Sequence, residues 1–155
     1  MAIKTADEYR ERLKRMKPNV YANGRLIGRD DPTLAPCVNT VAYTFDAAAD
    51  PRFQDLVVTT SHLTGEKINR FANINTSVDD LLKKQEMIRT LTHQVGNCIQ
   101  RCMATDTINA IGLVSKEIDE AKGTEYHKRF LEFLKYYQGN DLVASASQTD
   151  LNSFL

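Results

Sequence analysis

Residues 77–102 read SVDDLLKKQEMIRTLTHQVGNCIQRC, and this stretch decides the fold class. Its apolar positions recur mainly at steps of three and four residues, the spacing of one face of an α-helix. Ser77 followed by Asp79 and Asp80 is typical of a helix N-terminus, where a hydroxyl caps free N–H groups and acids suit the helix dipole. Gly96 can kink or divide the helix. The sequence therefore predicts a central helical pattern that runs on to Cys102.

Cys98 and Cys102 lie four residues apart in this pattern. Side chains at that spacing share one helix face, so two thiolates could hold adjacent corners of one metal ion or cluster. The plainer alternative is that both pack in the core, since free cysteine is among the most buried residue types. If the segment is not helical, or the two sulfurs point to opposite sides of the helix, the ligand assignment fails and the core alternative wins. A metal site also needs more ligands, and His62, His93 and His127 show no second ligand spacing.

The flanking segments also predict mainly helix. Thr5 and Glu8 have the spacing of a capping box. Helical patterns follow at about 37–49, around 108–123 with Gly123 as the C-terminal cap, and at 125–138 with Thr124 as the N-terminal cap. Asn23-Gly24, within 20–27, supplies the positive φ angles of a two-residue hairpin turn. The prediction is an all-α fold with one small β-hairpin.

The length, the net charge and the number of cysteines narrow the class of protein. A chain of 155 residues is one domain by length, and its 20 basic and 20 acidic residues leave no net field to attract nucleic acid or an anionic membrane. No apolar run approaches the roughly 18 residues that a membrane span needs. Three cysteines are odd in number, which favours reduced thiols and a cytoplasmic location over a disulfide framework. The third, Cys37, has no partner in sequence and is expected in the core.

Other catalytic patterns are absent from the sequence. There is no nucleophilic triad, Gly-rich phosphate loop or HExxH helix. Carboxylates at 79–80 and 117–120 are more simply solvated groups or dipole partners at helix ends than acid–base catalysts. From the residues alone, the chain is a helical domain with a possible thiolate pair.

A resemblance extends this interpretation. Residues 67–74, 79–81, 98–102, 126–128 and 133–142 resemble the family of 4-hydroxybutyryl-CoA dehydratase, which is also a vinylacetyl-CoA Δ-isomerase. It belongs to the superfamily of the flavin-dependent 4-hydroxyphenylacetate 3-hydroxylases. The likeness runs from about Thr5 to Asp150. It implies an acyl-CoA dehydrogenase-like enzyme, of which residues 1–150 form the N-terminal helical domain, followed by a middle β domain and a C-terminal helical bundle.

The resemblance also implies cofactors and chemistry. It implies FAD and a [4Fe-4S] cluster held by three cysteines and one histidine, with Cys98 and Cys102 as two of these ligands. The monooxygenase relatives lack this cysteine pair, so the pair favours the dehydratase branch. Enzymes of that branch remove a β-hydrogen of the substrate that is not acidic. A flavin can assist by accepting one electron transiently, and the cluster can act as a Lewis acid toward the hydroxyl group that leaves.

The likeness stops at Thr149 and Asp150, the two candidate flavin-contacting residues. The family continues there with a charged loop that contacts flavin, whereas residues 151–155 diverge. We therefore expect a chain without the middle and C-terminal domains that is inactive alone, although the complete enzyme would take an acyl-CoA. Its expected partners are a second copy of itself or a complementary C-terminal polypeptide. The alternatives are a flavin-dependent 4-hydroxyphenylacetate 3-monooxygenase domain and a non-catalytic helical interaction module.

Overall fold

The computed structural model describes residues 3–146, and most of these residues are helical. Within these residues the helices are α1 (Ala6–Arg15), α2 (Ala35–Ala49), α3 (Gln54–Val57), α4 (Val78–Val95), α5 (Cys102–Lys122) and α6 (Tyr126–Gly139). Two 3₁₀ turns, η1 (Pro32–Leu34) and η2 (Arg70–Ala72), accompany them. The predicted mostly α fold is confirmed. None of the helices described is long and apolar enough to cross a membrane.

Two small antiparallel hairpins complete the structure, where the sequence predicted one. The predicted hairpin pairs β1 (Val20–Ala22) with β2 (Arg25–Ile27) around Asn23 and Gly24, whose φ angles are 50° and 75°. The second pairs β3 (Val58–Thr60) with β4 (Lys67–Asn69), so that Thr59 faces Ile68. The connection from β3 to β4 is six residues long, so it lacks the two-residue turn signal that marked the first hairpin.

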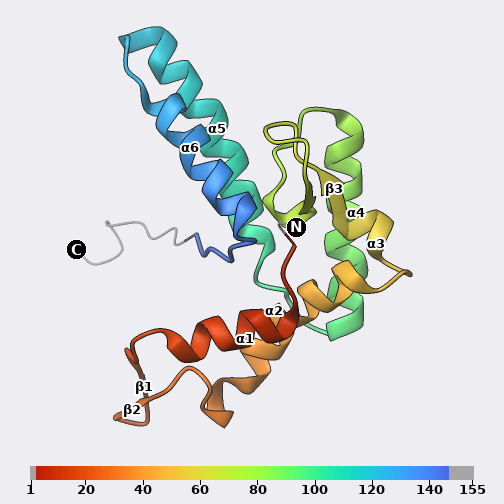
Figure 1. The fold of residues 1–155 in the computed structure, drawn as a ribbon, viewed down its shortest axis with the longest axis vertical. Helices are drawn as coiled ribbons and strands as arrows, with labels where there is room; N and C mark the ends of the chain where they lie inside the picture. The colour runs from red at the N-terminus through yellow and green to blue at the C-terminus, as the bar shows by residue number, and fades with distance from the viewer. Residues whose placement is uncertain (1–2, 147–155) are drawn as a thin grey trace, which may run out of the picture.

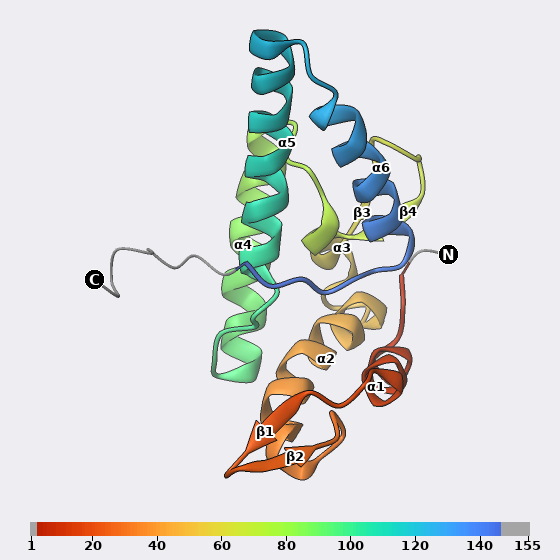
Figure 2. The same cartoon turned by 90° about the vertical axis from the view of Figure 1, so that its left-hand side faces the viewer.

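The elements form three groups that meet at the centre of the molecule. Figure 1 shows α5 and α6 as an antiparallel pair that leans away from the rest, with α1, α2 and the β1–β2 hairpin at the opposite end. Helix α4 lies with α3 and β3 on the remaining side, and Figure 2 shows η2 and β4 between α4 and α6. Helices α1 and α2 pack together, α2 reaches α3 and α4, and η2 contacts both α5 and α6.

Three buried clusters hold these groups together. One joins the end of α2 to α3, η2 and α4, with Phe71, Met87 and Leu91 fully buried. A second lies between η2, α5 and α6, around Ile108 and Leu134. The third joins α1 to α2: Ala6, Val41, Ala42, Phe45. Because η2 contributes to two clusters, the short segment 70–72 is where the α5–α6 pair joins the rest of the domain.

Most helix ends follow the local signals. The Thr5–Glu8 capping box is present, the Ser77 hydroxyl accepts from Asp80 N at 3.1 Å, and Gly123 ends α5 with φ 65°. The predicted Thr124 cap of α6 is wrong. Asp119 of α5 accepts the free N–H groups of Tyr126 and His127, each at 2.8 Å, while the Thr124 hydroxyl donates to the same carboxylate. Asp119 is therefore a capping group and the helix-end interpretation of this carboxylate holds.

Candidate functional site: the cysteine loop

The central helix does not continue through the two cysteines. Helix α4 ends at Val95, Gly96 adopts the left-handed conformation with φ 64°, and α5 begins at Cys102. The residues between them, 96–101, are non-helical and are called the cysteine loop below. The prediction that Gly96 divides the helix is confirmed, whereas the prediction that Cys98 lies on a helix face is wrong.

Burial in the cysteine loop alternates from one residue to the next. Ile99 and Arg101 have no exposed side-chain surface, whereas Cys98 and Gln100 are exposed. The backbone makes a tight turn here, with Gln100 at φ 63° and Arg101 N donating to Ile99 O at 2.7 Å. Ile99 packs in the cluster of Met87 and Leu91. The chain therefore leaves the helical path in a turn that buries the side chains of Ile99 and Arg101 and exposes those of Cys98 and Gln100.

The two thiols are nevertheless close enough to influence each other's charge. Cys98 is exposed, and Cys102 is half-buried against the α2–α4 cluster. Burial raises the pKa of the Cys102 thiol, and the neighbouring Cys98 raises it further by charge and by hydrogen bonding. The backbone N–H groups at the start of α5 act in the opposite direction and favour a thiolate. The site is thus a pair of adjacent sulfurs at a helix N-terminus, one of them open to solvent.

The loss of the helix meets the condition set for rejecting the ligand assignment, but the core alternative that should replace it is wrong for Cys98, which is exposed. Cys37, which was expected in the core, is exposed on α2, so that prediction is wrong. Within residues 3–146, no three His, Cys, Asp or Glu side chains gather where they could hold one metal ion. The described part of the chain therefore offers a pair of soft ligands and not a closed site. The assignment of both cysteines as metal ligands stays a prediction, and Thr149 and Asp150 lie outside the described residues.

Arg101, which sequence reasoning did not single out, is the best-connected residue of the loop. Its guanidinium forms a buried ion pair with Asp141, whose side chain is 2% exposed. It also donates to the Thr44 hydroxyl at 3.1 Å. The rings of Phe45 and Phe71 lie 4.4 and 5.4 Å from its central carbon. No local pattern links positions 101 and 141, so only the tertiary structure reveals the contact.

A groove lies away from the cysteines, between α5 and α6. The groove has a volume of about 530 Å³, extends to the chain before α4 and includes His127 and Phe130 in its lining. His127 Nδ1 is 3.1 Å from the Ser115 hydroxyl. Asp119, the neighbouring carboxylate, is engaged by backbone N–H groups of α6, so it does not orient the imidazole by a hydrogen bond.

The fold and the paired thiols define a class of domain, which comparison with known proteins identifies. The chain belongs to the family described as 4-hydroxyphenylacetate 3-hydroxylase N terminal, which matches residues 5–153. Within it, the chain is 44% identical over 150 residues to the 4-hydroxybutyryl-CoA dehydratase/vinylacetyl-CoA-Δ-isomerase of Clostridium aminobutyricum. The match covers 96% of this chain and 31% of that protein. The resemblance noted from the sequence is confirmed.

Solved structures agree with this assignment. An oxygen-tolerant archaeal 4-hydroxybutyryl-CoA dehydratase from N. maritimus superposes with a TM-score of 0.86 at 41% identity, over 91% of this chain and 28% of that one. The oxygenase component of 4-hydroxyphenylacetate 3-monooxygenase, in complex with FAD and 4-hydroxyphenylacetate, gives a TM-score of 0.72. Its identity is 18%, over 90% of this chain and 29% of that one, and this likeness shows the fold alone. The chain spans less than a third of each of these relatives.

Proposed function

We propose that this chain supplies the N-terminal domain of an enzyme that dehydrates 4-hydroxybutyryl-CoA and isomerises vinylacetyl-CoA. The observation that carries the proposal is the 44% identity to an enzyme of that name across 96% of the chain. The adjacent thiols of Cys98 and Cys102 support it from the structure.

In this proposal the two cysteines bind one edge of a [4Fe-4S] cluster. The donor set fits, because iron–sulfur clusters take thiolate ligands and these two sulfurs are neighbours, with Cys98 open to approach. Burial and the neighbouring Cys98 raise the pKa of the Cys102 thiol overall, so a bound metal would itself have to displace the proton, with the N–H groups at the start of α5 acting in its favour. When bound, the cluster supplies a Lewis acid and FAD supplies one-electron chemistry. The remaining cluster ligands and most of the flavin contacts beyond Thr149 and Asp150 would come from domains that complete the enzyme.

The first alternative is a domain of a flavin-dependent 4-hydroxyphenylacetate 3-monooxygenase. The oxygenase component of that enzyme shares this fold at 18% identity, against 41% for the archaeal dehydratase, so the dehydratase is favoured. Iron content discriminates between them, because the cysteine pair has a ligand role in the dehydratase assignment alone.

The decisive experiment is complementation. The chain is co-expressed anaerobically with a polypeptide covering the part of the Clostridium enzyme that this chain does not match. We expect a complex that contains iron and FAD and converts 4-hydroxybutyryl-CoA to crotonyl-CoA, while the chain alone is inactive. Cys98→Ser and Cys102→Ser should each lower bound iron, and Cys37→Ser, an exposed cysteine on α2, serves as the matched control. A complex that is active but free of iron, or unaffected by Cys98→Ser, would overturn the cluster assignment.

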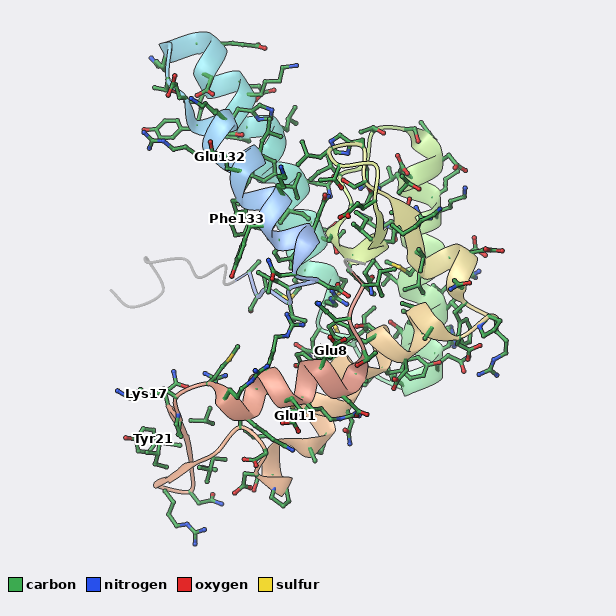
Figure 3. All side chains as sticks on the ribbon, viewed as in Figure 1. Glu8, Glu11, Lys17, Tyr21, Glu132 and Phe133 are labelled. Atoms are coloured by element: carbon green, nitrogen blue, oxygen red, sulfur yellow. The ribbon has the colours of Figure 1, made fainter. Side chains whose placement is uncertain are left out.

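The same proposal implies association, either between copies or with a complementary polypeptide. Large apolar side chains are exposed along α5 and α6, including Leu113 at 61% and Tyr136 at 61%. Figure 3 shows Phe133 projecting from α6, and Tyr21 projecting from the β1–β2 hairpin at the other end of the molecule. Extended apolar surface of this kind is typical of interfaces. We expect the chain alone to self-associate in light scattering, and co-expression with the complementary polypeptide to replace that self-association.

Reduced thiols at Cys98 and Cys102 would require a reducing compartment such as the cytoplasm.

The third alternative is a non-catalytic helical interaction module. It differs from the main proposal in one measurable outcome: it predicts a stable complex that contains neither iron nor FAD. The metal and flavin analysis of the complementation experiment therefore separates the two.

A further inference from the structure

We propose that the buried Arg101–Asp141 ion pair is a positioning device for the cysteine pair. It ties the cysteine loop to the chain that follows α6, so the separation of the two thiols depends on this contact. The inference rests on the proposed role of Cys98 and Cys102 as ligands of one group, and it assigns Arg101 a task that no local pattern indicates.

The first step is how the loop is held. Arg101 lies immediately before Cys102 and three residues after Cys98. Within the loop, Arg101 N donates to Ile99 O at 2.7 Å, and Cys98 N donates to the Asn97 side chain at 2.7 Å. Neither bond connects the loop to the rest of the domain. That connection comes from the side chains of Ile99 and Arg101, which are both completely buried.

The second step is what Arg101 reaches. It bonds Asp141 and donates to Leu142 O at 3.2 Å, both in the segment that follows α6. It also reaches Thr44 and stacks on Phe45 of α2, and contacts Phe71 of η2. One side chain therefore joins three parts of the domain that are far apart in sequence to the loop that carries the thiols.

The third step is how Asp141 is itself held. Its second carboxylate oxygen accepts from Lys4 N at 3.1 Å. Arg12 of α1 donates to Asn140 O at 2.8 Å and to Asp141 O at 3.3 Å. The acceptor for Arg101 is thus fixed by the N-terminal segment and by α1. A buried ion pair is weak evidence for stability, because desolvation offsets the attraction of the charges. Here its geometric effect is to set where the chain enters α5, and hence where Cys102 stands relative to Cys98.

The test measures thiol geometry directly on the 155-residue chain, with phenylarsine oxide as the probe. Capture breaks two S–H bonds and forms two As–S bonds, and the oxide oxygen leaves as water, so it requires two sulfurs within reach of one arsenic atom. Affinity is measured by competition with a small dithiol, and mass spectrometry gives the stoichiometry. A Cys37→Ser background removes the remaining thiol.

We expect the parent chain to capture one arsenic atom through Cys98 and Cys102. Arg101→Met should weaken capture about tenfold or more, the range seen when partners that orient metal ligands are removed. Arg101→Lys should recover part of the affinity. Arg70→Met is the matched control, because Arg70 is also buried, at 5% exposure, donates to the Leu56 carbonyl at 2.7 Å and lies near Asp80. It should leave capture within about twofold of the parent, as expected for an independent site.

Each outcome decides one point. If the parent does not capture arsenic through both thiols, the ligand pair of the proposed function fails, and this inference fails with it. If the parent captures it and folded Arg101→Met does so equally well, the positioning inference alone is wrong. Equal weakening by Arg70→Met would show a general loss of stability and would also overturn it. Should Arg101→Met not fold, Asp141→Asn, which keeps the shape of the partner, provides the same comparison.

Discussion

Ile99→Ala tests how much the burial of this side chain in the cysteine loop stabilises the domain. Ile99 has no exposed surface and packs with Met87 and Leu91. The substitution removes three buried carbon groups, worth about 2 kcal/mol at about 0.8 kcal/mol each. The cavity left behind adds to this loss, so we expect the free energy of unfolding to fall by about 3 kcal/mol.

Urea denaturation followed by circular dichroism measures this change, and a thermal scan should show a decrease in Tm of about 6–12 °C for a domain of this size. Ile111→Ala is the matched control, because Ile111 lies on α5 with 48% of its surface exposed. It should change the free energy of unfolding by less than about 0.5 kcal/mol. The reasoning would be refuted by a loss below about 1 kcal/mol for Ile99→Ala, because a fully buried isoleucine cannot be truncated so cheaply.

Gly96→Ala should destabilise the chain by about 1–2 kcal/mol in urea denaturation, because φ is 64° there and an L side chain is strained in that region; an unchanged midpoint would contradict this. Stability should also fall in acid. Burial raises the pKa of Asp80, but hydrogen bonds from Thr76 and Ser77 and the charge of Arg70 outweigh it and lower the pKa below its usual value. The stabilisation is therefore present above the unfolded-state pKa of about 3.9 and is lost as the pH falls through the lower folded-state pKa. Urea midpoints from about pH 6 to about pH 3 should show this loss, and Asp80→Asn should make the curve flatter; an identical acid dependence in the variant would rule Asp80 out.

The helix and turn signals that lie within a few residues of one another predicted the structure well. The Thr5–Glu8 capping box, the Ser77 cap, Gly123 and the Asn23-Gly24 turn all occur where the sequence placed them. These features are determined by hydrogen bonds and φ angles that span four residues or fewer, so the local sequence contains all the information they need. The resemblance to the dehydratase family also came from sequence alone.

The features around the candidate site depend on contacts that are distant in sequence. Apolar periodicity predicted that the central helix continues through Cys98, but the chain turns there, with Gln100 at φ 63° and the side chains of Ile99 and Arg101 buried against other elements. The α6 cap comes from Asp119 of the preceding helix, and Arg101 finds its partner 40 residues away at Asp141. The sequence by itself determined the class of fold and the presence of two cysteines near a helix boundary. The tertiary structure decided that the arginine between them is buried, because its partner Asp141 and the rings of Phe45 and Phe71 come from elements distant in sequence.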